Sequence, residues 1–330
     1  MVHPALSSRD NSHLSNGAVG PNLSTNEIDS WAPAFIDSTA VPPHIRALGA
    51  ILILTLTGCG AAAQRTAPTA PRPSHLASQS PEPTNGASAT PTPAPVIDAA
   101  YVTLELATVE EMIRHPETPA SDYASLGQRQ QKALHLLAAH SDWVATVLGE
   151  LPAAIRSAIQ DNLTAGQQID TLNGPSSSLP HWKIIAPPTP DTLMGYYREA
   201  ESAYGIAWQY LAAINLIETN MGRIQGLSSA GAQGPMQFMP ATWASYGRGD
   251  VNNPRDAILA AGRYLKAHGA PQEMTRAIYA YNPSMLYVRA VQIYAQQMFG
   301  NSRTYLAYYN WQVYVHTRNG DVWLPEGFIG

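Results

Sequence analysis

A glutamate at the edge of an apolar helix is the residue of this chain best suited to proton-transfer chemistry. The segment 206–222 repeats apolar side chains at helical spacing, at Tyr210, Ile214, Ile217 and Met221. Glu218 lies at the edge of this stripe, where partial burial disfavours the charged carboxylate and raises the carboxyl pKa. A carboxyl group that stays protonated near neutral pH is suited to general acid–base catalysis. Taken alone, such a glutamate is more often structural than catalytic, so its surroundings decide the interpretation.

Two glycine-bearing segments follow Glu218 and favour a ligand site beside it. The segment 228–234 reads Ser-Ser-Ala-Gly-Ala-Gln-Gly. Small residues let the backbone approach a ligand and offer its N–H and C=O groups to hydroxyl and N-acetyl groups. The segment 234–240 reads Gly-Pro-Met-Gln-Phe-Met-Pro and leads into a further helix. We therefore expect the chain after Glu218 to line a polar site.

Four blocks of sequence, in order, resemble the lytic transglycosylases of the goose-type-lysozyme superfamily. They are Glu-Thr-x-x-Gly at 218–222, Gly-x-x-Gln-Phe-Met-Pro at 234–240, Asp-Ala-Ile…Tyr-Leu-Lys-Ala-His-Gly at 256–269, and Ala-Tyr-Asn at 280–282 with a later Tyr-Val. The first three look most like the membrane-bound lytic transglycosylase B branch, and the fourth looks more like the soluble-type branch. The resemblance covers about 190 to 300 of the chain. It implies a lysozyme-like helical catalytic domain.

The resemblance also implies roles for individual residues. Glu218 matches the single catalytic acid/base of the family. The candidate substrate-binding residues are Thr219, Gly234, Met236, Gln237, Tyr264, Tyr281, Asn282 and Tyr287. Tyr281 would stabilise developing charge. Pro283-Ser284 replaces the usual Ala-Gly after Tyr-Asn, which changes the loop there.

The activity implied is that of a peptidoglycan lytic transglycosylase that remodels the cell wall. Such an enzyme cleaves the MurNAc–GlcNAc β-1,4 bond of glycan strands and forms 1,6-anhydroMurNAc. Two alternatives remain open: lysozyme-like hydrolysis by the same Glu218, or a non-catalytic peptidoglycan-binding lipoprotein. Retention of Glu218 argues against the non-catalytic reading.

No metal or other cofactor is expected. The calcium-binding loop of the B branch is shortened here to 249–253, whereas an EF-hand loop needs about twelve residues with acidic ligands at set positions. His268 and His316 stand apart in the sequence from any carboxylate or cysteine cluster, so a metal or triad role is not indicated. Asp256 is interpreted as a helix-start residue.

The elements that must position these residues are mainly helical. Apolar periodicity and breakers predict helices at 191–204, 206–222, 254–268, 271–282 and 284–299. Alternation at 311–317, then Asn319-Gly320 and 321–324, predicts a small C-terminal β-hairpin. We assign 190–330 to the lysozyme-like domain. A small helical module at 98–173, without recognisable chemistry, precedes it.

The chain before residue 98 carries the features of an export signal. After Arg46 comes an apolar run of about ten residues, too short to span a membrane but suited to a signal peptide. Leu56-Thr57-Gly58-Cys59 resembles the lipobox of bacterial lipoproteins, in which the cysteine becomes lipidated. The predicted segments are therefore a disordered or mis-annotated extension at 1–45, the signal and lipobox at 46–59, and a disordered Ala/Pro/Ser/Thr linker at 60–97.

Charge and cysteine content indicate which partners the protein binds and where it is located. The net charge of -5 offers no basic footprint for nucleic acid. Cys59 is the sole cysteine, so no intrachain disulfide can form. We expect an exported monomer, anchored through lipid on Cys59 to the outer face of the bacterial cell membrane.

Overall fold

The structure, a computed structural model, describes residues 96–330. The predictions for Cys59 and for the rest of the chain before residue 96 lie outside the described residues. No helix in the described range combines the length and the apolar character that crossing a membrane requires.

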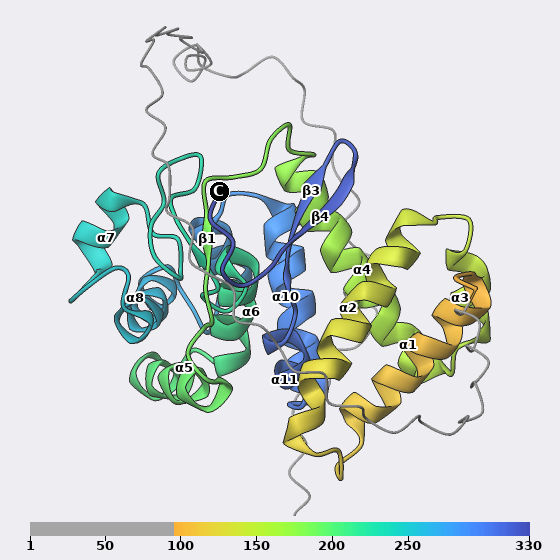
Figure 1. Ribbon diagram of the computed structural model, residues 1–330. Coiled ribbons are helices and arrows are strands. Elements are labelled where there is room, and N and C mark those ends of the chain that lie inside the picture. The colour runs from red at the N-terminus through yellow and green to blue at the C-terminus, as the bar shows by residue number, and fades with distance from the viewer. Residues whose placement is uncertain (1–95) are drawn as a thin grey trace, which may run out of the picture. The chain divides into compact units, whose positions relative to one another are not determined.

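The described residues form a mainly helical fold with a C-terminal β-hairpin, which confirms the predicted fold class (Figure 1). The first helices are α1 (Ala99–Arg114), the 3-10 turn η2 (Ala120–Asp122), α2 (Tyr123–Ala139), α3 (Val144–Glu150) and α4 (Ala153–Asn173). The later ones are α5 (Pro190–Tyr204), α6 (Trp208–Thr219), α7 (Pro240–Tyr246), α8 (Pro254–Ala267), α9 (Met274–Tyr281), α10 (Met285–Gly300) and α11 (Thr304–Tyr309). The strands are β1 (Lys183–Ile184), β2 (Ile224–Gln225), β3 (Val313–Thr317) and β4 (Gly320–Leu324).

Local sequence explains where several of these helices begin. The Asn253 side chain accepts hydrogen bonds from the backbone N–H groups of Arg255 and Asp256, so it caps α8, and Pro254 occupies the first helical position. Asp256 lies in the first turn of that helix, as predicted. Ser284 caps α10 in the same way, by accepting from the N–H of Leu286.

One hydrophobic core extends through both halves of the described chain. Helix α10 packs against α4 on one side and α6 on another (Figure 1). A single buried cluster includes Val102 of α1, Leu134 of α2 and Ile159 of α4 together with Ile214 of α6 and Val291 of α10. The limits of the proposed 98–173 module and 190–330 domain stay a prediction, but their helices are packed as one body.

Helix α6 differs from its predicted form. It is buried on almost every side rather than along one stripe, and Tyr210 and Ile217 are only partly buried. It also ends at Thr219 instead of continuing to residue 222, because Asn220, Met221 and Gly222 have φ values of 52°, 62° and 87°. These left-handed conformations turn the chain away directly after Thr219, one residue beyond Glu218. The carboxyl group is therefore carried by the last turn of a central, tightly packed helix.

The hairpin was predicted, whereas the smaller strands and α11 were not. Strands β3 and β4 pair antiparallel, with Tyr314 opposite Trp323. Strands β1 and β2 pair Lys183 with Gln225. Two-residue strands and a six-residue helix are too short for apolar periodicity to reveal.

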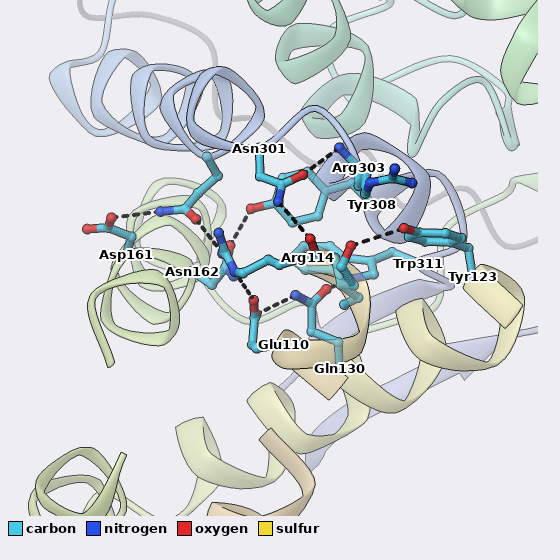
Figure 2. A network of polar contacts seen from close by, with 12 residues as sticks. Glu110, Arg114, Tyr123, Gln130, Asp161, Asn162, Asn301, Arg303, Tyr308 and Trp311 are labelled. Atoms are coloured by element: carbon cyan, nitrogen blue, oxygen red, sulfur yellow. Dashed lines mark hydrogen bonds and ion pairs between the residues drawn. The ribbon is translucent and has the colours of Figure 1, made fainter. Parts of the chain in front are cut away.

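A buried polar network joins the first helices to the last ones (Figure 2). Glu110 of α1 has no exposed surface, and it accepts hydrogen bonds from Gln130 at 2.6 Å and from Arg114 at 3.1 Å. Gln130 also accepts from the indole N–H of Trp311 at 2.9 Å, and Tyr308 donates to Asn162 of α4 at 2.5 Å. Polar contacts buried to this degree are expected to fix how α1, α2 and α4 dock on α10 and α11.

The substitution Glu110→Ala is expected to lower the free energy of unfolding by about 3 kcal/mol, since it removes the acceptor of the Arg114 Nε–H group and of the buried Gln130 amide. Denaturant unfolding followed by circular dichroism measures this change. Glu111→Ala, at the exposed neighbouring position, is the matched control and should change stability by less than about 0.5 kcal/mol. Equal effects of the two substitutions would contradict a structural role for the buried carboxylate.

Candidate active site

A cleft of about 920 Å³ is hollowed between the two halves of the described chain. The end of α6, the start of α10 and the loop around Ser228 line one part of it. The remaining lining comes from α2, α4, the segment that follows α4, and β3. Its volume lies near the upper end of the range for ligand sites, which is about 300–1,000 Å³.

Glu218 lines this cleft and contacts a tyrosine from a different helix. The hydroxyl of Tyr287, in the first turn of α10, donates a hydrogen bond of 2.5 Å to Oε1 of Glu218. Burial raises the pKa of Glu218 to about 7, and the hydrogen bond from Tyr287 opposes that rise. The carboxyl group is therefore partly protonated near neutral pH, as its position on the helix predicted, and it can both donate and accept a proton.

Two more of the predicted residues, Gln237 and Asn282, line the cleft with Glu218 and Tyr287. Gln237 has a φ of 48°, and its side-chain amide donates to the carbonyl of Gly234 at 2.9 Å. Asn282 is the C-cap residue of α9 and directly follows Tyr281, the last residue of that helix. The structure thus gathers four predicted residues, from three of the four sequence blocks, around one cleft.

Three of the predicted residues lie behind this surface. Thr219 is fully buried, and its hydroxyl donates to the carbonyl of Pro235 at 2.6 Å. The side chain of Met236 is fully buried, while its carbonyl accepts a hydrogen bond from Tyr281 at 2.6 Å. Gly234 has a φ of 72°, and a Cβ atom there would lie 1.9 Å from the carbonyl oxygen of Val251, so no side chain fits. The hydrogen bond from Thr219 thus holds the 234–237 loop against α6, and the hydrogen bond from Tyr281 holds it against α9.

Tyr281 and Tyr264 belong to an aromatic group that supports the site. The ring of Tyr281 lies parallel to that of Tyr287, with centroids 6.5 Å apart, and edge-on to Tyr264 at 5.4 Å. The Tyr264 hydroxyl donates to the carbonyl of Ala280 at 2.7 Å. Burial raises the pKa of Tyr281 well above its ordinary value, and the nearby Glu218 adds to the rise. Both hydroxyls are thus engaged by backbone carbonyls, and Tyr287 is the tyrosine that contacts Glu218.

The rate of a reaction that needs protonated Glu218 should fall as the pH rises through about 7. Tyr287→Phe removes a hydrogen bond that stabilises the carboxylate, so the pKa of Glu218 should rise further and the alkaline limb should move to higher pH. Initial rates of peptidoglycan solubilisation from pH 5 to 9 measure this limb. In the control variant Tyr264→Phe, the midpoint of the alkaline limb should stay at the wild-type pH. A shift of this midpoint to lower pH in Tyr287→Phe would contradict the stabilisation of the Glu218 carboxylate by Tyr287.

The cleft has a second wall, which the sequence did not reveal. It is formed by side chains of α2, α4 and the hairpin, including His135, Asn162, Asp170, His316 and Asp321. Nδ1 of His135 and Nδ1 of His316 lie 2.5 and 2.8 Å from the two carboxylate oxygens of Asp321. Within residues 96–330 no three His, Cys, Asp or Glu side chains are arranged to hold a metal ion. In the sequence these residues are recognisable only as polar, and polar residues are equally typical of a solvent-exposed helix face.

One comparison with known proteins matched the segment of the chain that contains Glu218. Residues 195–298 match the family model described as the transglycosylase SLT domain. This match, which runs from α5 to α10 and includes Glu218, supports a lytic transglycosylase-type domain acting on peptidoglycan glycan. Neither the comparison with curated proteins nor that with solved structures gave a match.

Proposed function

We propose that the protein is a lytic transglycosylase that cleaves the MurNAc–GlcNAc β-1,4 bond of peptidoglycan and leaves 1,6-anhydroMurNAc. The observation that carries the proposal is Glu218, a carboxyl group with a pKa raised to about 7 in a large cleft of a transglycosylase-type domain. A group that titrates near the working pH is suited to give a proton to the leaving oxygen and then to accept one.

The proposed reaction uses Glu218 twice. Glu218 first protonates the glycosidic oxygen while the N-acetyl oxygen of the substrate stabilises the positive charge at C1. The resulting carboxylate, held by the hydroxyl of Tyr287, then removes the proton from the MurNAc C6 hydroxyl, which attacks C1. The anhydro ring closes, Glu218 is protonated again, and no water is consumed. Gln237 and Asn282 are proposed to hold the sugars beside Glu218.

A single carboxylate within the matched segment supports this route over a two-carboxylate glycosidase. Three acidic residues line the cleft, and Glu218 is the one that belongs to the matched segment. Asp170 and Asp321 lie on the second wall, where Asp321 contacts His135 and His316. Asp256 instead accepts a hydrogen bond from the backbone N–H of Asp250 outside the cleft. Glycosidases that retain or invert use a pair of carboxylates, whereas substrate-assisted enzymes need one. Hydrolysis by the same Glu218 would differ only in the nucleophile that reaches C1.

The proposal is tested by incubating the full chain with purified peptidoglycan and analysing the soluble products by mass spectrometry. Disaccharide-peptides one water lighter than their hydrolysed forms are expected. Products with ordinary reducing ends would instead make the protein a lysozyme-type hydrolase. If no fragment is released, the catalytic proposal fails and a peptidoglycan-binding role remains.

We further propose that the protein is exported as a monomer and anchored by lipid on Cys59 to the outer face of the cell membrane. The support is the lipobox-like sequence at 56–59 and the peptidoglycan substrate that the domain match implies. Metabolic labelling with a radioactive fatty acid should mark the wild-type chain and leave Cys59→Ala unlabelled.

A further inference from the structure

A carboxylate outside the cleft holds the loop that connects α7 with α8. Oδ2 of Asp256, in the first turn of α8, accepts a hydrogen bond of 3.0 Å from the backbone N–H of Asp250. The same carboxylate lies directly against Gly249, whose φ is 82°, and a Cβ atom at Gly249 would collide with it. Asp256 therefore fixes the middle of this loop against the start of α8.

The loop in turn supports Gly234. The carbonyl oxygen of Val251 lies so close to Cα of Gly234 that no side chain fits there. The Val251 side chain is partly buried and packs on the hydrophobic core. Because Val251 directly follows Asp250, a shift of the loop away from Asp256 would move the carbonyl group against which Gly234 packs.

Gly234 begins a tight turn that presents Gln237 to the cleft. The carbonyl of Gly234 accepts hydrogen bonds from the backbone N–H of Gln237 at 3.0 Å and from its side-chain amide at 2.9 Å. Two backbone hydrogen bonds between Gln233 and Phe238, of 2.9 and 2.8 Å, close the turn. Gln237 has a φ of 48°, a conformation that is unfavourable for residues other than glycine and persists only where surrounding contacts hold it. The orientation of Gln237 therefore depends on the position of Gly234.

We propose that Asp256 is a positioning residue for substrate binding. It acts through the 249–251 loop and through Gly234 on Gln237, although it lies outside the cleft. This inference rests on the proposed function, in which Gln237 holds a sugar beside Glu218. Glu218 itself is held from other directions, by its place in α6 and by a hydrogen bond from α10. Loss of Asp256 should therefore weaken substrate binding and leave proton transfer unchanged.

Hydrogen exchange of the full chain tests the positioning without substrate. Asp256→Ala removes the acceptor of the Asp250 N–H, so the backbone amides of the peptide 233–238 should exchange about fivefold faster, the effect of one hydrogen bond. Asp256→Asn keeps an oxygen that can accept this hydrogen bond, and its exchange should be close to that of the wild type. Peptides from α10 should exchange equally fast in all three proteins.

The matched control for this experiment is Asp191→Ala. Asp191 is exposed and lies in the first turn of α5, as Asp256 does in α8, so the variant reports the loss of a first-turn charge on its own. Its peptide 233–238 should exchange at the wild-type rate. Equal acceleration by the two alanine substitutions, or none by Asp256→Ala, would overturn the inference.

Kinetics separate a positioning role from a general loss of stability. In the active chain, Asp256→Ala should raise KM for peptidoglycan about fivefold, while kcat and the midpoint of the alkaline limb stay at their wild-type values. In the Gln237→Ala background the same substitution should raise KM no further, because the side chain that it positions is absent. Effects of the two substitutions that multiply would contradict a route through Gln237. Failure of the wild-type chain to release fragments would instead refute the proposed catalysis, and the exchange rates would still decide whether Asp256 holds the 233–238 turn.

Discussion

Glu218→Gln is expected to reduce the release of soluble glycan fragments by at least about a thousandfold, because glutamine can neither give nor take a proton. The substitution preserves shape and leaves an oxygen that can accept the hydrogen bond from Tyr287. Rates of fragment release from purified peptidoglycan, wild type against variant, measure the loss. A residual rate within about tenfold of wild type would assign the proton transfer to another group.

The free energy of unfolding shows whether the Glu218→Gln variant is folded. The raised pKa of Glu218 also determines how the stability difference between the variant and the wild type changes with pH. The pKa of Glu218 is about 7 in the folded state and 4.5 as the ordinary value, so below pH 4.5 the group is protonated in both states. Between pH 4.5 and about 7, Glu218 releases its proton in the unfolded chain but keeps it in the folded chain. The wild type therefore loses stability as the pH rises from 4.5 to about 7. Glu218→Gln should therefore gain stability relative to wild type between pH 5 and pH 8. The opposite trend in denaturant unfolding would contradict the burial of the carboxyl group.

A fragment comprising residues 190–330 is expected not to fold on its own, although it contains every proposed catalytic residue. Removing α1 to α4 exposes the face of α10 that packs on α4. It also takes away the partners of three buried or part-buried polar side chains: Gln130 from Trp311, Asn162 from Tyr308, and Asp161 from Gln297. The combined loss should exceed the roughly 5–15 kcal/mol by which a domain is stable.

Circular dichroism and denaturant unfolding of this fragment, beside a fragment of residues 96–330, measure the effect. The longer fragment should unfold in one cooperative transition, and the shorter one should show none. A cooperative transition in the shorter fragment would make 98–173 a separate module, as the predicted domain limits have it.

The sequence predicted those parts of the fold that depend on local pattern. Helix α8 was expected at 254–268 and runs from Pro254 to Ala267, since Asn253 caps it and Pro254 occupies its first turn. The hairpin followed from alternation and from the Asn319-Gly320 pair. The raised pKa of Glu218 was predicted in direction, although its cause is burial in a central helix rather than a position at the edge of an apolar stripe.

The rest depends on contacts between distant segments. Helix α6 is central, so it lost the one-sided pattern, and the left-handed residues Asn220 and Met221 ended it early without a glycine signal. The second wall of the cleft brings His135 of α2 to Asp321 of β4, 186 positions apart in the chain. No spacing rule predicts such a pair, and each residue by itself has the character of a solvated surface position.

The central claim, that the C6 hydroxyl rather than water attacks C1 while Glu218 transfers the proton, is tested most directly by digesting peptidoglycan in water enriched in oxygen-18. The disaccharide-peptides are then weighed by mass spectrometry. Our account predicts anhydro products that carry no label, because no water enters the reaction. Products that carry one heavy oxygen at C1 would show that water is the nucleophile and would contradict the claim.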